Sequence, residues 1–393
     1  MCDKIGRVAV IGMGTMGSDI SLLFALYDFE VVVNDISRSV LDNLERKHRQ
    51  TLDELHKLGL TQKKYETVKE KITVARKLED IKDVDFVLEA VNEDLTVKRN
   101  LFAHLDKLPL EVVLATNTSF LRVSDIAKGL KGAKRIGLMH FSNPPILSPL
   151  VEVVKGEETS EETLKTIAEV AKRIGKTPVI LRKDMNGAVL NRILGGLGSD
   201  AFLAIQRGEV TPEELDASMK AAGFPVGFAE VADMIGLDII LSVNKTLSNV
   251  YGASPNPTLK FLEDMVKEGR LGKKSGRGFY DWTKGHPIID TKLAGKYDVM
   301  RIIANGVNAA FGVIKDEVAD PKTIDTVMKL GSSSQMGICE IADLIGLDKL
   351  LEVLKRLYKE YGLEIYKPCP MFEEYVKRGW TGRVAGRGLY EYQ

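Results

Sequence analysis

The sequence predicts a doubly wound α/β domain at the N-terminus, followed by two tandem all-helical domains. Three observations point to this architecture: a strand, glycine-rich turn, helix and strand at the start, later short apolar runs separated by helix-compatible stretches, and an internal repeat in the second half. Alternating strands and helices are typical of a parallel sheet covered by helices. We expect the domains to comprise residues 1–184, 185–290 and 291–393.

Short apolar runs that are bounded by polar or turn residues predict the strands of the α/β domain. A helix-period pattern over residues 16–28 follows the first run, and the long, lysine-rich stretch 37–71 is predicted to be a helical excursion from the sheet. After about residue 182 the pattern changes from strands to helix-period segments. The runs expected to form buried strands are 7–11, 30–34, 85–90, 111–116, 136–139 and 150–154.

The helical part contains one sequence twice. Residues 229–238 recur as 339–348, and residues 275–280 recur as 385–390, both at an offset of 110 positions, while an upstream block repeats at 109. Two separated blocks at one offset indicate the duplication of a whole domain. Because two like domains with a shared apolar face associate about a twofold axis, we expect the second copy to pack on the first as a dimer partner would.

Composition excludes several classes of protein. The 393 residues include 55 Lys and Arg and 55 Asp and Glu, so no global field draws the chain to nucleic acid or to an anionic membrane. Cys2, Cys339 and Cys369 form neither a disulfide framework nor a metal-binding CxxC pair. No apolar run approaches the roughly 20 residues of a membrane span, and residues 1–7 lack a signal-peptide pattern. We expect a soluble, cytoplasmic protein without a metal.

A glycine pattern, Gly12, Gly14 and Gly17, directly follows the first predicted strand and opens a predicted helix. In a Rossmann-like fold these glycines allow a tight turn, close approach to a pyrophosphate and close helix–strand packing, and the helix N-terminus supplies free amides. Asp35 ends the second strand at the spacing of an acid that binds the ribose hydroxyls, and its charge would repel a 2′-phosphate. We therefore expect NAD rather than NADP, with Arg38 nearby as a possible phosphate partner.

A second group of polar residues suggests proton transfer. His140 ends an apolar strand before a proline-rich turn, and Glu152 lies within the next apolar strand, where a carboxylate is costly to bury unless it is paired. A hydride leaving a carbinol carbon requires removal of the hydroxyl proton, and an imidazole oriented by a carboxylate is a suitable base near neutral pH. Residues 116–119, which end in Ser119, and Asn191 either hold substrate oxygens or serve as caps and turn formers.

These motifs together resemble the L-3-hydroxyacyl-CoA dehydrogenases, and the resemblance runs over nearly the whole chain. It implies an NAD-dependent oxidoreductase of fatty acid metabolism and β-oxidation that oxidises the 3-hydroxyl of an acyl-CoA to a ketone. The doubled C-terminal domain occurs in some members, including fusions with an enoyl-CoA hydratase, so a separate or fused hydratase is an implied partner. The segments that carry the resemblance are residues 8–17 with Asp35, 89–98, 116–119, 140–144, 151–152, 184–192 and 272–280.

The resemblance also implies a role for individual residues. His140 would be the general base, Glu152 would orient it, and Ser119 and Asn191 would contact the reacting end of the thioester substrate. The implied cofactor contacts, beyond the three glycines of the turn, are Asp35, Glu93, Lys98 and Asn143. Two other functions remain open: a non-catalytic dinucleotide-binding relative of the family, and a dehydrogenase of a free 3-hydroxy acid.

Overall fold

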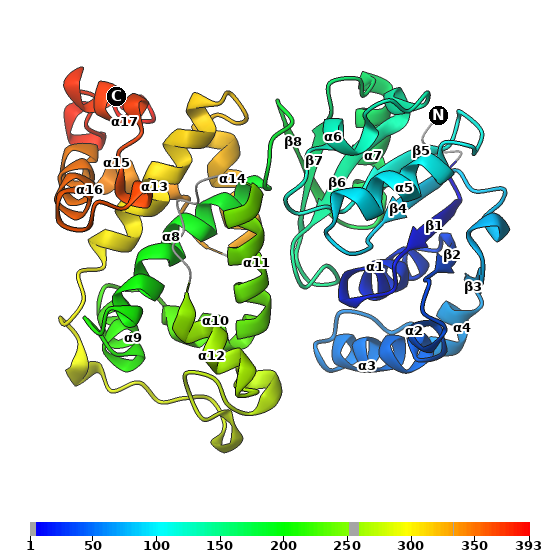
Figure 1. Cartoon of the computed structure of the whole chain (residues 1–393), viewed down its shortest axis with the longest axis horizontal. Coiled ribbons are helices and arrows are strands. Elements are labelled where there is room, and N and C mark those ends of the chain that lie inside the picture. The colour runs from blue at the N-terminus through cyan, green and yellow to red at the C-terminus, as the bar shows by residue number, and fades with distance from the viewer. Residues whose placement is uncertain (1–4, 251–258, 333) are drawn as a thin grey trace. The chain divides into compact units, whose positions relative to one another are not determined.

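The computed structural model describes residues 5–250, 259–332 and 334–393 (Figure 1). The chain forms two compact units. The first comprises Met1–Ala188 with Glu317–Ala319 and Thr326–Gln335, and the second comprises Val189–Asp316, Asp320–Asp325 and Met336–Gln393. The division of the helical part near residue 290 stays a prediction.

The first unit is built on a single eight-stranded sheet with the order β3-β2-β1-β4-β5-β6-β7-β8. Neighbouring strands are parallel except β6 and β7, which pair antiparallel. The doubly wound architecture is confirmed, and β3 and β8 are additions that the apolar runs did not predict. The strands are β1 (Arg7–Ile11), β2 (Glu30–Asn34), β3 (Ile72–Val74), β4 (Phe86–Glu89), β5 (Val113–Thr116), β6 (Ile136–Phe141), β7 (Leu150–Lys155) and β8 (Thr177–Leu181).

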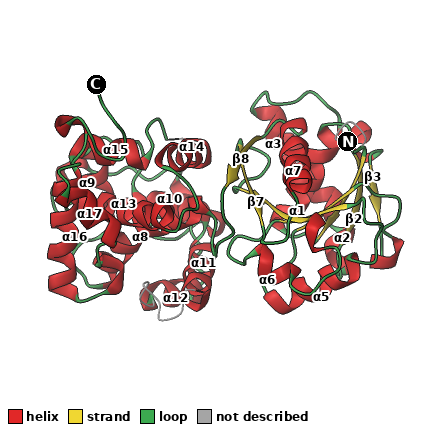
Figure 2. Ribbon diagram, turned by 90° about the horizontal axis from the view of Figure 1, so that it is seen from above, coloured by secondary structure: helices red, strands yellow, loops and turns green. Residues whose placement is uncertain are grey.

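Helices cover both faces of this sheet, with α7 on one face and α5 and α6 on the other (Figure 2). The predicted excursion is confirmed, because α2, α3 and α4 lie between β2 and β3. The buried core joins apolar residues of the strands to those of the flanking helices, chiefly α1 and α7. The helices are α1 (Thr15–Leu26), α2 (Arg38–Asp42), α3 (Leu44–Lys57), α4 (Tyr65–Lys69), α5 (Leu95–Leu105), α6 (Val123–Ala127) and α7 (Glu161–Arg173).

The second unit contains most of both copies of the repeat, and both copies fold alike. Glu317–Ala319 and Thr326–Gln335 of the second copy, which include part of α14, belong to the first unit. Helices of the first copy are α8 (Val189–Gln206), α9 (Pro212–Ala221), α10 (Phe228–Ile235), α11 (Leu237–Val250) and α12 (Lys260–Lys267). Helices of the second copy are α13 (Met300–Lys315), α14 (Pro321–Ser332), α15 (Ile338–Ile345), α16 (Leu347–Tyr361) and α17 (Pro370–Lys377). The duplication inferred from the sequence is therefore present in the fold.

The two copies pack on each other through α8 and α13. A Cβ atom on Gly306 would lie 2.5 Å from Leu197, so only glycine allows the helices to approach this closely. Leu197 and Gly306 occupy equivalent positions at the offset of 109, as expected for residues beside a pseudo-twofold axis. Phe202 of the first copy and Tyr366 of the second also share one hydrophobic core.

Three further findings concern the predicted compartment and the predicted lack of a metal site. No helix among the described residues is both long and apolar enough to cross a membrane. Cys339 and Cys369 are free thiols, and Cys2 lies outside the described residues. In the same described part of the chain, no three His, Cys, Asp or Glu side chains are grouped closely enough to hold a metal ion.

Candidate active site

The glycine turn between β1 and α1 has the geometry of a phosphate-binding loop. Gly12 has φ = 93°, and a Cβ atom there would lie 2.6 Å from the carbonyl oxygen of Ala90. A Cβ atom on Gly17 would lie 1.7 Å from the carbonyl oxygen of Gly12, so a larger residue cannot pack there. Gly14 is exposed with open space around its Cα, and no side chain caps the α1 N-terminus. These residues fit the pyrophosphate of a dinucleotide.

Asp35 follows β2 and is tied to this turn. Its carboxylate accepts hydrogen bonds from the backbone N–H groups of Met13 and Ser37, both at 2.7 Å. The acid therefore lies beside the loop, as a ribose-binding residue must, and its contact with the ribose stays a prediction. Arg38 is largely exposed and lies 3.9 Å from Asp42.

His140 and Glu152 form a buried pair across the antiparallel strands β6 and β7. They are register partners, and Nδ1 of His140 lies 2.9 Å from Oε2 of Glu152. On the other side of the ring, Nε2 lies 3.2 Å from Oγ of Ser119. The histidine and the glutamate are 3% and 0% exposed. The fold thus brings three of the four predicted catalytic residues together, and the hydrogen bond to Glu152 directs Nε2 at Ser119.

Ser119 belongs to the turn after β5, and each residue of this turn has a specific partner. Thr116 donates to Oε2 of Glu89 at 2.7 Å, and Oδ1 of Asn117 accepts from the backbone N–H of Phe141 at 2.9 Å. The roles of Glu89 and Asn117 were not foreseen from the sequence. A glutamate inside the apolar strand 85–90 was the available signal, by the same reasoning that singled out Glu152.

A buried ion pair lies behind the turn. Nζ of Lys98 lies 2.6 Å from Oε1 of Glu89 and 3.4 Å from Oε2 of Glu93. Burial raises the pKa of Glu89, whereas the charge and hydrogen bond of Lys98 and the hydroxyl of Thr116 act to lower it. Glu93 is more open than its neighbours, with a side chain 26% exposed. Lys98 and Glu93 therefore belong to one network, and their predicted contact with the cofactor remains a prediction.

The remaining predicted residues lie at the ends of elements. Asn143 is exposed and follows β6 three residues after His140. Asn191 lies in the first turn of α8, in the helical unit, and its contact with the substrate stays a prediction. The backbone N–H of Ala188, the last residue before α8, donates to the carbonyl of Ser119 at 2.9 Å. The chain thus leaves the first unit beside the Ser119 turn.

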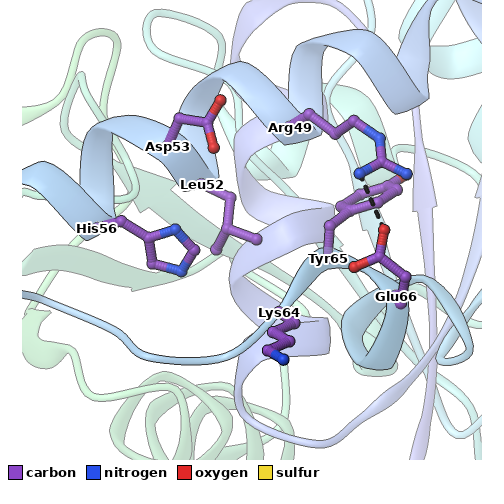
Figure 3. A pocket seen from close by; sticks show the side chains of 7 residues that line it. All are labelled: Arg49, Leu52, Asp53, His56, Lys64, Tyr65 and Glu66. Carbon is purple, nitrogen blue, oxygen red and sulfur yellow. Dashed lines mark hydrogen bonds and ion pairs between the residues drawn. The ribbon is translucent and has the colours of Figure 1, made fainter.

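A separate hollow of about 230 Å³ lies on α3 and α4 (Figure 3). Arg49 lies 4.1 Å from the centre of the Tyr65 ring and pairs with Glu66 at 3.1 Å. None of the predicted site residues lines this hollow. It is a hollow of the helical excursion, lined by charged side chains together with Leu52 and Tyr65.

Comparison with known proteins covers both units. Residues 7–185 match the family model of the 3-hydroxyacyl-CoA dehydrogenase NAD binding domain. Residues 187–282 and 297–392 each match the model of the 3-hydroxyacyl-CoA dehydrogenase C-terminal domain. The repeat found in the sequence is thus two copies of one known domain.

Individual relatives agree with these matches. A probable 3-hydroxybutyryl-CoA dehydrogenase of Bacillus subtilis (strain 168) is 36% identical over 282 residues, which are 71% of this chain and 98% of that protein. The 3-hydroxyadipyl-CoA dehydrogenase of Escherichia coli (strain K12) is 27% identical over 95% of this chain and 98% of its own.

A solved structure shows the same fold. The crystal structure of a 3-hydroxybutyryl-CoA dehydrogenase from Escherichia coli K12 superposes with a TM-score of 0.82 and 26% identity, covering 96% of this chain and 100% of that one. The family models, the relatives and the fold agree over both units. The chain therefore belongs to the 3-hydroxyacyl-CoA dehydrogenase family, whose N-terminal domain binds NAD.

Proposed function

We propose that the chain reversibly oxidises an (S)-3-hydroxyacyl-CoA to the 3-oxoacyl-CoA, with hydride transfer to NAD⁺ and His140 as the general base. The observation that carries this proposal is the pair of contacts to His140, with Glu152 on Nδ1 and Ser119 on Nε2. A protein that only binds a dinucleotide has no need for a buried base with its orienting carboxylate.

The proposed steps follow from this arrangement. Nε2 of His140 takes the proton of the substrate 3-hydroxyl, and the electrons of that O–H bond form the second bond of the ketone. NAD, when bound, accepts the hydride that leaves C3. Glu152 holds the ring in the tautomer that leaves Nε2 free to accept, and its charge stabilises the imidazolium that forms. The 3-oxygen would lie against Ser119 and Asn191.

The cofactor would be held by the glycine turn and by four further residues. Gly12, Gly14 and Gly17 would enclose the pyrophosphate. The other proposed contacts are Asp35, Lys98 and Asn143, together with Glu93, for which the family resemblance is the only support. The names of the relatives include hydroxybutyryl and hydroxyadipyl substrates, which supports an acyl-CoA substrate and leaves the acyl group to be measured. The scattered cysteines support a cytoplasmic location.

The test follows NADH absorbance with acetoacetyl-CoA and, separately, with free acetoacetate. We expect turnover of the thioester only. H140A should lower kcat on the order of 10²–10⁴-fold, the usual contribution of a positioned acid–base group, while the Kd for NADH changes little. E152Q should also be slow. If neither substrate is turned over, the result would favour a non-catalytic dinucleotide-binding protein. Turnover of free acetoacetate alone would favour a dehydrogenase of a free 3-hydroxy acid.

A further inference from the structure

The hydroxyl group of Ser119 is useful only if its position relative to His140 is fixed. Ser119 lies in a turn without regular hydrogen bonding, directly after β5. A shift of about 1 Å in a positioning group can cost on the order of 100-fold in rate. Some feature of the fold must therefore hold this turn.

One carboxylate oxygen meets three donors of the turn. Oε1 of Glu93 accepts from the Thr118 hydroxyl at 2.5 Å and from the backbone N–H groups of Ser119 at 2.9 Å and Phe120 at 2.7 Å. The Thr118 hydroxyl in turn accepts from the backbone N–H of Leu121 at 3.0 Å. Charge-assisted hydrogen bonds of this kind are stronger than neutral ones. Glu93 therefore holds the backbone on both sides of the Ser119 side chain.

The other oxygen of Glu93 is itself held in place. Oε2 lies 3.4 Å from Nζ of Lys98, whose side chain is 1% exposed and which is fixed by Glu89 at 2.6 Å and by the carbonyl of Val91 at 3.2 Å. Glu89 also holds Thr116 at the start of the turn. The turn is thus anchored at both ends by one buried network.

We propose that Glu93 is a positioning residue, which sets the place of the Ser119 hydroxyl opposite Nε2 of His140 by accepting the three donors of the turn. This inference rests on the proposed function, in which Ser119 contacts the reacting oxygen. It differs from the role that the family resemblance implies for Glu93, a direct contact with the cofactor. In the positioning role the acceptor oxygen is essential, and the negative charge strengthens the three hydrogen bonds that it accepts.

This distinction makes E93A and E93Q an informative pair. Glutamine keeps an oxygen that accepts the three bonds and removes the charge, whereas alanine removes the acceptor. We expect E93A to lower kcat on the order of 10- to 100-fold with acetoacetyl-CoA. E93Q should recover part of that loss, because it keeps the acceptor oxygen but lacks the charge and places an amide nitrogen where Oε2 faces Lys98. The Kd for NADH of both variants should stay close to that of the parent protein.

The neighbouring residue Asp94 supplies a matched structural control. Its carboxylate caps α5 by accepting from Val97 at 2.9 Å and makes no described contact with the turn. D94A should cost stability in urea unfolding while kcat stays at the level of the parent protein. This control separates a general loss of stability from loss of the turn.

A double-mutant cycle tests whether Glu93 acts through Ser119. If it does, S119A should slow the E93A protein far less than it slows the parent. Additive effects of the two substitutions, or an E93Q protein as slow as E93A with a raised Kd for NADH, would overturn the proposal in favour of a cofactor contact. Turnover by the parent protein and its loss in H140A test the proposed function separately.

Discussion

The two copies of the helical domain keep the same structural anchors. In the first copy, Asp216 accepts from the backbone of Ala229 and Glu230 at the start of α10 and from the Tyr280 hydroxyl at 2.8 Å. In the second copy, Asp325 accepts from Cys339 and Glu340 at the start of α15 and from the Tyr390 hydroxyl at 2.7 Å. The equivalent pairs of residues are Asp216 and Asp325, Ala229 and Cys339, Glu230 and Glu340, and Tyr280 and Tyr390.

A second anchor is repeated as well. Asp233 accepts from the backbone N–H groups of Phe279 and Tyr280, and Asp343 accepts from those of Leu389 and Tyr390. The third donor differs, since it is the Trp282 indole in one copy and the Tyr392 hydroxyl in the other. What the duplication has preserved is a pair of buried carboxylates that close the end of the domain onto its helices.

The two copies differ at the candidate substrate contact and at the buried acid where they pack on each other. Asn191, the candidate substrate contact, corresponds to Met300 in the second copy. Asp200 of α8 corresponds to Ala309, so the buried acid at the junction of the copies occurs once. From this comparison we infer that the second copy is maintained as a folded partner, and that one chain carries one active site.

The largest expected effect comes from removing that partner. Truncation after Trp282 deletes the second copy, including Arg301 and Tyr366, and exposes the face of α8 that carries Leu197 and Phe202. We expect the truncated protein to dimerise or aggregate, because association buries the apolar face that the second copy covers in the full chain. Size-exclusion chromatography with light scattering measures this. A well-behaved monomer of undiminished stability would show that the second copy serves another purpose, such as docking a separate hydratase.

A smaller effect is expected from the single buried acid at the junction. Asp200 is 0% exposed and accepts from the hydroxyls of Tyr297 and Tyr366 and from the Arg301 guanidinium at 2.9 Å. Burial acts to lower the pKa of Arg301, but its hydrogen bonds and attraction to Asp200 and Glu209 hold it above the ordinary value.

D200A leaves that guanidinium without its buried partner. We expect a loss of about 3–5 kcal/mol in the free energy of unfolding, the usual cost of breaking a buried pair, measured by urea denaturation. E209Q is the control, because Glu209 pairs with Arg301 at 3.0 Å from a position 27% exposed and should cost much less. Equal losses in the two variants would mean that burial of Asp200 is not what joins the copies.

The sequence predicted those parts of the fold and of the candidate site that leave a clear pattern. Such patterns are a repeated segment and a charged residue within an apolar strand. The repeat revealed the helical domains, and the glutamate at 152 revealed the partner of His140. Strand β3 was missed because it is three residues long and mostly exposed, so it has no buried apolar run. The antiparallel direction of β7 was missed because strand direction depends on the neighbouring strands and not on composition.

The scaffold of the Ser119 turn illustrates a further limit. Glu89 and Thr116 are 27 positions apart, and Asn117 and Phe141 are 24 apart. Each of these residues taken alone is an ordinary strand or turn residue, and only the pairing of β4, β5 and β6 brings them together. Residue type therefore singled out His140 and Glu152, the candidate base and its carboxylate, whereas the groups that position them could be found only from the fold.

The smallest expected effect concerns the equivalent anchors Asp216 and Asp325, and it depends on pH. Burial raises the pKa of Asp216 to about 6, although the hydrogen bonds from Ala229, Tyr280 and Glu230 act to lower it. Burial also raises the pKa of Asp325. Because the folded pKa lies above the unfolded value, this carboxyl contributes stability that is full below about pH 4 and is lost as the pH rises through about 6.

This contribution amounts to about 3 kcal/mol at most for Asp216, at 1.36 kcal/mol per pKa unit. Asparagine does not titrate, so the free energy of unfolding of D216N should lack the part of the pH dependence that comes from Asp216. The stability of D216N relative to the parent protein should therefore improve as the pH rises from 4 to 7. Urea unfolding across that range measures the slope. D325N should show the same sign with a smaller amplitude, because Tyr390 is partly exposed whereas Tyr280 is buried. If D216N keeps the slope of the parent, the first anchor stays charged throughout, and the two copies differ in their packing alone.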